Sequence, residues 1–169
     1  MTKQNFISMS LESGLKYVDL LCEPDDNICT LKGILNGLYC DEHGNVDCEI
    51  NDCMPILRPL DLTKEIEHGG EKFVPIVELA KIASSKLKWA VAFKDGQCYI
   101  GTDVYQKQYT FFYSVYEQSF YINSIRDMKH TPYQFKLFQK LIEWHFDICN
   151  LISKNQAIDI NTLETNPYK

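Results

Sequence analysis

The sequence contains no long apolar run. Nowhere do about 20 consecutive apolar residues occur, which is the length that a helix needs to cross a bilayer. The opening residues 1–5 lack the apolar segment of a secretory signal. We therefore expect a cytoplasmic protein.

Proline and glycine are also scarce, with six and eight among 169 residues. Hydrophobic residues make up 45% of the chain and charged residues 24%, as in globular proteins and unlike disordered ones. A chain of this length typically folds as one domain of ordinary size. We predict a single domain over residues 1–169.

The cysteines show no pairing pattern of the kind that marks a secreted disulfide framework. There are seven, an odd number at irregular spacing, at positions 22, 29, 40, 48, 53, 98 and 149. In a reducing compartment such residues remain free thiols, and most are buried as small hydrophobes. We expect free thiols here.

The common sequence motifs of catalytic and nucleotide-binding sites are missing. There is no phosphate-binding Gly-x-x-x-x-Gly-Lys-Ser/Thr loop, no Gly-x-Ser-x-Gly elbow, no His-Glu-x-x-His helix, no dinucleotide fingerprint and no calcium loop. His68-Gly69-Gly70 is not followed directly by a helix and is typical of a hairpin turn. These absences lower the expectation of an enzyme, and we assign no cofactor and no catalytic, cofactor-binding or metal-binding residue.

Acidic residues are concentrated in the first part of the chain. Residues 1–70 hold 13 acidic and 5 basic residues, whereas residues 71–169 hold 10 and 12, and the net charge is −6. Binding to a phosphate backbone relies on clustered Lys and Arg, so we expect no nucleic-acid partner. The acidic part could imitate a phosphate backbone, but a solvated surface explains it equally well.

Apolar stretches separated by turn signals predict an α+β fold with antiparallel β-sheet built from hairpins. The predicted strands are one that begins near Lys16, residues 28–35, 38–40, 46–50, 65–67, 71–74, 88–93 and 97–101, and two within 105–122. Residues 54–60 contain Pro55 and Pro59, which exclude a helix and a central strand and favour an extended connection.

Helices are predicted in three places. Thr2 or Asn5 caps a short opening helix, and Pro75 begins a second one. A long amphipathic helix is predicted over residues 131–153, from the N-cap signal Thr131-Pro132. Its apolar positions recur at steps of three and four: Phe138, Leu141, His145, Ile148 and Ile152. We expect this long helix and one or two shorter ones to pack on the sheet.

Several blocks of the chain resemble a known family. They are residues 8–11, 14–16, 56–60, 62–66, 68–75, 137–148, 157–164 and 166–169. These blocks are similar to a family of small uncharacterised proteins from phages and prophages of gut Bacteroides-type bacteria. The resemblance implies a mobile element and a bacterial host cell, and it assigns no site residue.

Cys40, His43, Cys48 and Cys53 have the spacing Cys-x2-His-x4-Cys-x4-Cys. These are the intervals of a zinc knuckle, with the histidine and the second cysteine exchanged, and thiolate and imidazole are the donors that zinc prefers. The loop is strongly acidic, however, and Cys48 also fits an inward position of the predicted strand 46–50. Buried free thiols are the favoured interpretation, with zinc as the alternative.

His145 and Cys149 lie four residues apart on the predicted long helix. They could act as base and nucleophile of a hydrolase, with Glu143 or Asp147 nearby in the sequence. Both belong to the apolar stripe of that helix, which favours a core histidine and a buried thiol.

Aromatic residues are dense from Tyr105 to Tyr121, where the alternation places Tyr109, Phe111, Tyr113 and Val115 on one strand face and Phe112 and Tyr116 on the other. With Lys107, Arg126 and Lys129 around them, they could stack on single-stranded nucleic acid. Burial of a sheet face is the commoner role of such residues.

We therefore expect a non-enzymatic phage or prophage accessory protein that binds a host or phage protein. The alternatives are a small zinc-binding or nucleic-acid-associated module and an unrecognised hydrolase. No membrane partner is expected.

Overall fold

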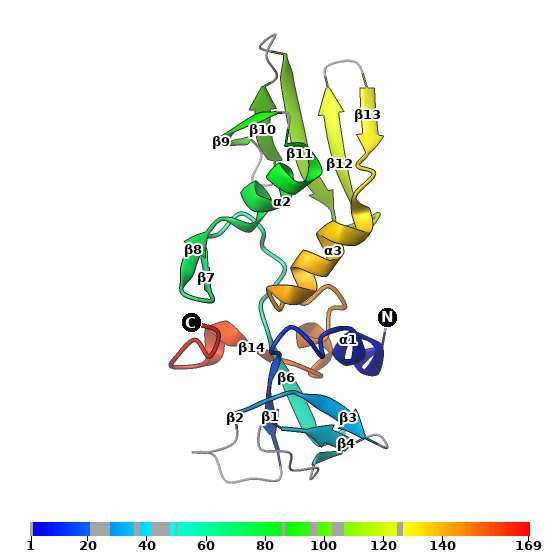
Figure 1. Cartoon of the computed structure of the whole chain (residues 1–169), viewed down its shortest axis with the longest axis vertical. Coiled ribbons are helices and arrows are strands. Elements are labelled where there is room, and N and C mark those ends of the chain that lie inside the picture. The colour runs from blue at the N-terminus through cyan, green and yellow to red at the C-terminus, as the bar shows by residue number, and fades with distance from the viewer. Residues whose placement is uncertain are drawn as a thin grey trace. The chain divides into compact units, whose positions relative to one another are not determined.

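The computed structural model (Figure 1) describes residues 2–20, 28–35, 38–41, 48–49, 51–85, 87–94, 98–102, 107–124 and 127–169. The chain divides into two compact units. Unit 1 comprises Met1–Leu60 and Leu141–Lys169, and unit 2 comprises Asp61–Lys140. A single domain over residues 1–169 stays a prediction.

In its described residues, unit 1 combines one short helix with two small sheets. Its elements are α1 Lys3–Met9, β1 Lys16–Asp19, β2 Ile28–Thr30, β3 Gly33–Leu35, β4 Leu38–Cys40, β5 Cys48–Glu49, β6 Cys53–Leu57, the 3₁₀ turns η1 Ile152–Lys154 and η2 Ile160–Thr162, and β14 Ile158–Asp159. One sheet has the order β14-β6-β1-β2 and the other β3-β4-β5. Thr2 caps α1 by accepting a hydrogen bond from Asn5 N at 3.2 Å, as predicted. Residues 36–37, between the predicted strands 28–35 and 38–40, lie outside the described residues.

β6 is an inner strand of its sheet, so the prediction that Pro55 excludes a central strand is wrong. Leu20 N donates a hydrogen bond to Asp52 O at 2.9 Å, so Leu20 and Asp52 form a hydrogen-bonded pair of the antiparallel β1–β6 ladder. Hydrogen-bonded and non-hydrogen-bonded pairs alternate along such a ladder. That alternation makes Tyr17 and Pro55 a non-hydrogen-bonded pair, so the proline ring removes no bond to β1. β14 pairs with β6 only beyond the proline, which explains why proline is tolerated here.

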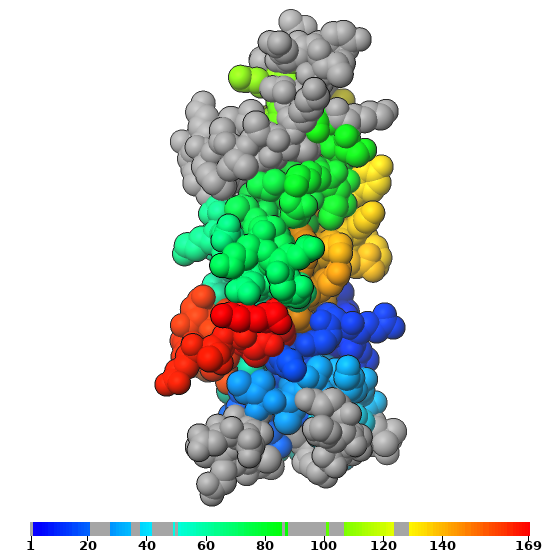
Figure 2. All heavy atoms as spheres, turned by 60° about the vertical axis from the view of Figure 1, so that its left-hand side comes forward, coloured from blue at the N-terminus to red at the C-terminus, as the bar shows by residue number. Residues whose placement is uncertain are grey.

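The C-terminal residues complete the core of unit 1. Figure 2 shows this segment, in red, against N-terminal residues in blue. The core cluster contains Val18, Ile56, Ile160 and Tyr168, with Ile158 and Leu163 against it. The Tyr168 hydroxyl donates to Ile56 O at 2.7 Å and accepts from Lys16 N at 2.9 Å. It therefore bridges β1 and β6 just beyond their last backbone pair.

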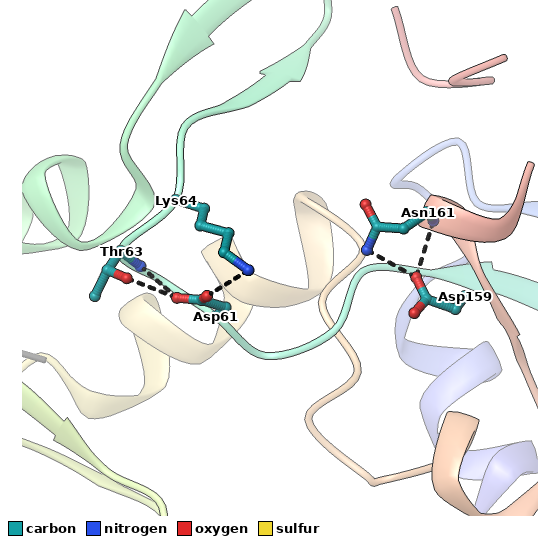
Figure 3. A network of polar contacts seen from close by, with 5 residues as sticks. All are labelled: Asp61, Thr63, Lys64, Asp159 and Asn161. Carbon is teal, nitrogen blue, oxygen red and sulfur yellow. Dashed lines mark hydrogen bonds and ion pairs between the residues drawn. The ribbon is translucent and has the colours of Figure 1, made fainter. Parts of the chain in front are cut away.

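Unit 2 begins with a turn that Asp61 stabilises. The Asp61 carboxylate accepts hydrogen bonds from Thr63 N at 3.1 Å and Thr63 Oγ1 at 2.7 Å, and Lys64 Nζ lies 3.2 Å from its second oxygen (Figure 3). Such a carboxylate-to-backbone contact two residues on defines an Asx turn, which fixes the chain direction before the hairpin that follows.

A hairpin and a helix follow, both as predicted. The hairpin consists of β7 Ile66–His68 and β8 Glu71–Phe73, and its turn residues Gly69 and Gly70 have φ values of 60° and 80°. Glycine adopts these left-handed values without strain. α2, Pro75–Ala83, buries its apolar positions Ile76, Leu79, Ala80 and Ala83.

The main sheet of unit 2 is a five-stranded antiparallel meander. Its strands are β9 Lys88–Lys94, β10 Cys98–Thr102, β11 Gln108–Ser114, β12 Ser119–Ser124 and β13 Asp127–His130, in chain order. Phe120 of β12 lies 5.7 Å from Phe111, 4.8 Å from Tyr113 and 5.5 Å from Phe138 of α3, Gln134–Glu143 (ring centroids). The strands predicted at 88–93, 97–101 and within 105–122 are confirmed, whereas residues 95–97, between β9 and β10, lie outside the described residues.

The long helix predicted over residues 131–153 is wrong, because α3 spans only Gln134–Glu143. The helix ends in a Schellman motif, in which Phe146 N donates to Leu141 O and His145 N donates to Ile142 O, both at 2.9 Å. His145 occupies the left-handed position of this motif, with a φ of 61°. The buried apolar residues that follow, Phe146, Ile148 and Leu151, therefore lie outside any helix, although their spacing is typical of one.

The α+β class with antiparallel sheets is confirmed. None of the helices that the structure describes has both the length and the apolar character that a membrane crossing requires.

Candidate functional site

Arg58 holds the turn that follows α3. Its side chain is buried, and Nε donates to Trp144 O at 3.1 Å. Its backbone N donates to His145 O and its carbonyl accepts from Asp147 N, both at 2.8 Å, which forms a parallel β-bridge. The guanidinium carbon also lies 5.7 Å from the centre of the Tyr168 ring. These contacts draw the chain after α3 into the core of unit 1.

The surroundings of His145 indicate a structural role and not a catalytic one. Only 1% of its surface is exposed, and its ring lies parallel to Tyr168 with the ring centroids 3.9 Å apart. Its Nε2 lies 3.0 Å from the carbonyl oxygen of Ser13. A carbonyl oxygen only accepts hydrogen bonds, so Nε2 carries the proton. That nitrogen is therefore a donor in the core and not a base.

The buried carboxylate of Asp147 organises the next turn. Its Oδ1 accepts hydrogen bonds from Cys149 N at 3.3 Å and Leu151 N at 2.8 Å, and its Oδ2 accepts one from Ile152 N at 2.8 Å. The three amides belong to the turn that leads into η1. A carboxylate that satisfies several backbone N–H groups acts as a cap, and this explains its burial without a catalytic role.

The helical spacing that would join His145 to Cys149 is absent, because α3 ends at Glu143. The Cys149 side chain is buried, and burial together with the Asp147 carboxylate raises the pKa of its thiol, against the opposing effect of Lys154. A raised pKa keeps the sulfur protonated at neutral pH, whereas a nucleophilic cysteine requires the thiolate. The arrangement favours a structural thiol.

Cys149 is accordingly expected to resist iodoacetamide in the folded protein near neutral pH and to react fully after denaturation in guanidinium. Peptide mass mapping measures both states, and the half-buried free thiol of Cys40 serves as the internal comparison, expected to react faster. Rapid alkylation of Cys149 in the folded state would restore the nucleophile hypothesis.

The zinc-knuckle candidate is only partly within the described residues. His43 lies outside them, and for Cys48 only the backbone is described. Cys53 is fully buried and disulfide-bonded, which corrects the expectation of a free thiol there and removes its thiolate from the candidate ligands. Within the described part of the chain no three His, Cys, Asp or Glu side chains are grouped as a metal site would require.

The aromatic strands mostly bury a sheet face, as the sequence favours. Phe111 and Tyr113 are buried as predicted, but Val115 and Tyr116 do not lie on strand faces, because β11 ends at Ser114. On the opposite face Phe112 and Tyr121 are stacked at 5.3 Å, and Tyr121 contacts the exposed His130 at 4.4 Å. Arg126 lies outside the described residues.

A hollow of about 390 Å³ opens on the sheet of unit 2. The described residues that line it are Lys107, Tyr109, Ile122, Lys129, His130, Thr131 and Pro132. Two of the basic residues named from the sequence, Lys107 and Lys129, are thus brought together, and Lys107 Nζ lies 5.5 Å from the centre of the Tyr109 ring.

Four large apolar side chains are exposed at one end of the same sheet. They are Val115 and Tyr116, in the β11–β12 turn, and Tyr133 and Phe135, at the start of α3. The Gln134 side chain accepts from Phe120 N at 2.9 Å and donates to Phe120 O, which ties the start of α3 to the first residues of β12 (Figure 1). We call these four residues the apolar patch.

The apolar patch is the candidate site that the sequence pattern misses. The alternation of apolar residues continues through Val115 and Tyr116, and only the polar Glu117-Gln118 pair marks the turn. Comparison of the chain with protein-family models, with curated proteins and with solved structures found no match.

Proposed function

We propose that this chain is a non-enzymatic accessory protein of a phage or prophage, and that it binds a host or phage protein through the apolar patch. The main support for the proposal is the solvent exposure of the four residues, which is 97% for Tyr116, 72% for Phe135, 57% for Val115 and 49% for Tyr133. Exposed apolar side chains gathered at one end of a sheet are a common feature of protein interaction sites, and aromatic side chains dominate their binding energy.

The geometry of the patch supports binding without large rearrangement. Tyr133 and Phe135 flank Gln134, whose side chain makes two hydrogen bonds to the backbone of Phe120. Ser114 pairs with Ser119 and closes the turn that presents Tyr116. Because both segments are held by the sheet, little conformational entropy would be lost when a partner covers them.

The chemistry of the patch favours an apolar partner surface. Tyr116 and Tyr133 combine an apolar ring with a hydroxyl that can remain hydrogen-bonded at an interface. Glu117 and Lys136, both exposed, flank the patch with one charge of each sign. The mobile-element context comes from the resemblance of the sequence blocks, and it directs the search for a partner to the infected host cell.

The test is affinity purification of the tagged chain from its bacterial host during phage growth, with identification of the proteins that co-purify. The wild-type chain is compared with the double variant Tyr116→Ser/Phe135→Ser, which is expected to lose at least about tenfold of the bound partner, since hot-spot truncations cost about 2 kcal/mol or more. Met9→Ser is the matched control, because Met9 is also an exposed apolar residue but lies in unit 1.

Stoichiometric recovery of one protein with the wild type and with Met9→Ser, but not with the double variant, is the expected result. Equal recovery with all three chains would contradict the patch as the binding surface. A concentration-dependent dimer of the purified chain that the double variant abolishes would replace the foreign partner with a second copy of this chain.

A further inference from the structure

The strand β13 forms an outer edge of the five-stranded sheet of unit 2 (Figure 1). Among the described strands its only neighbour is β12, with which it pairs in the antiparallel direction. Lys129 and His130 of this strand are exposed, as is Pro132 just beyond it. An edge strand presents backbone N–H and C=O groups to which another chain can pair, so this edge is a candidate interaction surface.

The hydrogen-bond register shows which backbone groups face the open edge. Thr131 N donates to Phe120 O at 3.2 Å, so Thr131 and Phe120 form a hydrogen-bonded pair of the β12–β13 ladder. Hydrogen-bonded and non-hydrogen-bonded pairs alternate along such a ladder. His130 and Met128 therefore belong to non-hydrogen-bonded pairs, and their N–H and C=O groups point away from β12. Each of these two residues offers one donor and one acceptor to an added strand.

The hollow of about 390 Å³ adjoins this edge. Its described lining includes the consecutive residues 129–132, which run along the edge, and Tyr109 and Ile122 further into the sheet. Ile122 pairs with Lys129, and directly paired residues share a face. A residue of an added strand that lies opposite Lys129 would therefore point toward the hollow. In strand addition, backbone hydrogen bonds give affinity, and pockets for alternate side chains give specificity.

The edge leads directly into the apolar patch, because Thr131 and Pro132 are the only residues between β13 and Tyr133. A second copy of this chain is a poor occupant. If Met128 of each copy paired with His130 of the other, Lys129 would lie opposite Lys129, and like charges directly opposite each other destabilise a ladder. The surface therefore favours a strand of a different protein.

We propose that the partner protein adds an extended strand to β13, with hydrogen bonds to the backbone of Met128 and His130 and an apolar side chain in the hollow, beside Ile122 and Pro132. This inference rests on the proposed function, because the same partner covers the apolar patch. Binding depends on backbone groups of β13 and not on its side chains, which sets the strand contact apart from the contact with the patch.

Proline substitution at the edge tests the proposal in the co-purification experiment. His130→Pro removes an outward N–H group and no backbone bond to β12, and proline is tolerated at such edge positions. We expect recovery of the partner to fall about tenfold or more, because its carbonyl group loses a donor at the interface. Met128→Pro tests the second outward residue in the same way.

His130→Ala is the matched control, because it also removes the imidazole but keeps the N–H group. It should recover as much partner as the wild type, and Met128→Ala is the corresponding control at the other position. Far-UV circular dichroism verifies the fold of each variant.

Amide hydrogen exchange of the purified chain, followed by NMR, tests the open edge without a partner. The amides of Met128 and His130 are expected to exchange faster than those of Lys129 and Thr131, whose N–H groups face β12. Slow exchange at both Met128 and His130 would show that the edge is already closed, and this would overturn the proposal.

Equal recovery of the partner with the proline and alanine variants would overturn strand addition. If Tyr116→Ser/Phe135→Ser still lost the partner in that experiment, the proposed function would stand without it. Recovery of no partner by the wild-type chain would overturn both. A dimer of the purified chain that His130→Pro abolishes would assign the edge to a second copy, which also contradicts the proposal.

Discussion

Replacement of Tyr168 by alanine is expected to lower the free energy of unfolding of unit 1 by about 3–5 kcal/mol, as for other buried aromatic residues. The Tyr168 ring is 6% exposed, contacts Val18, Ile56 and Ile160 in the core and stacks on His145. Its truncation opens a cavity and leaves the backbone groups that its hydroxyl bridges without that partner. Urea denaturation followed by far-UV circular dichroism measures the change.

Two control variants show how much of the lost stability comes from the ring, how much from the hydroxyl, and whether burial of the tyrosine matters. Tyr168→Phe keeps the ring and is expected to cost about 1–3 kcal/mol, the penalty for buried polar groups that lose a partner. Tyr116→Ala removes a 97% exposed tyrosine and should leave stability almost unchanged. A Tyr168→Ala variant as stable as Tyr116→Ala would show that the C-terminal segment does not belong to the core.

Replacement of Asp147 by alanine is expected to destabilise the protein by about 3 kcal/mol, because hydrogen bonds to a charged acceptor contribute about 1.5–3 kcal/mol each and do not add fully. Three amides, of Cys149, Leu151 and Ile152, lose their acceptor at a buried site. Asp147→Asn keeps one acceptor oxygen and should cost less. Thermal and urea unfolding measure the series.

Asp159 is the matched control for Asp147. Its Oδ1 accepts hydrogen bonds from N and Nδ2 of Asn161, both at 2.9 Å and both exposed (Figure 3). Asp159→Ala removes an N-cap of η2 and is expected to cost about 1 kcal/mol. If Asp147→Ala costs no more than Asp159→Ala, burial adds nothing to the cap, and the structural role assigned to Asp147 is wrong.

Elements with local signals could be predicted from the sequence. Gly69-Gly70 supplies the left-handed turn of the β7–β8 hairpin, and Pro75 supplies the start of α2, so each signal lies within the element that it specifies. The end of α3 has no such signal. Glycine or asparagine usually occupies the left-handed residue of a Schellman motif, whereas this chain has His145 there, held by Tyr168 from a distant part of the sequence.

Long-range pairing also explains the error at Pro55. A proline in a strand argues against an inner position, because it cannot donate to the ladder. Whether that matters depends on the register with Tyr17 and on where β14 begins, and neither is visible in the local sequence. The apolar patch is hidden for the same reason, since the alternation through Tyr116 is compatible with a strand until the position of the β11–β12 turn is known.

Site-specific photo-crosslinking at position 116 tests the proposed binding surface most directly. Benzoylphenylalanine replaces Tyr116 in one chain and the exposed Lys72 of the β7–β8 hairpin in another, and both are irradiated in host cells during phage growth. We predict one discrete adduct with a host or phage protein from position 116 and none from position 72. No adduct from position 116, or the same adducts from both positions, would contradict the account.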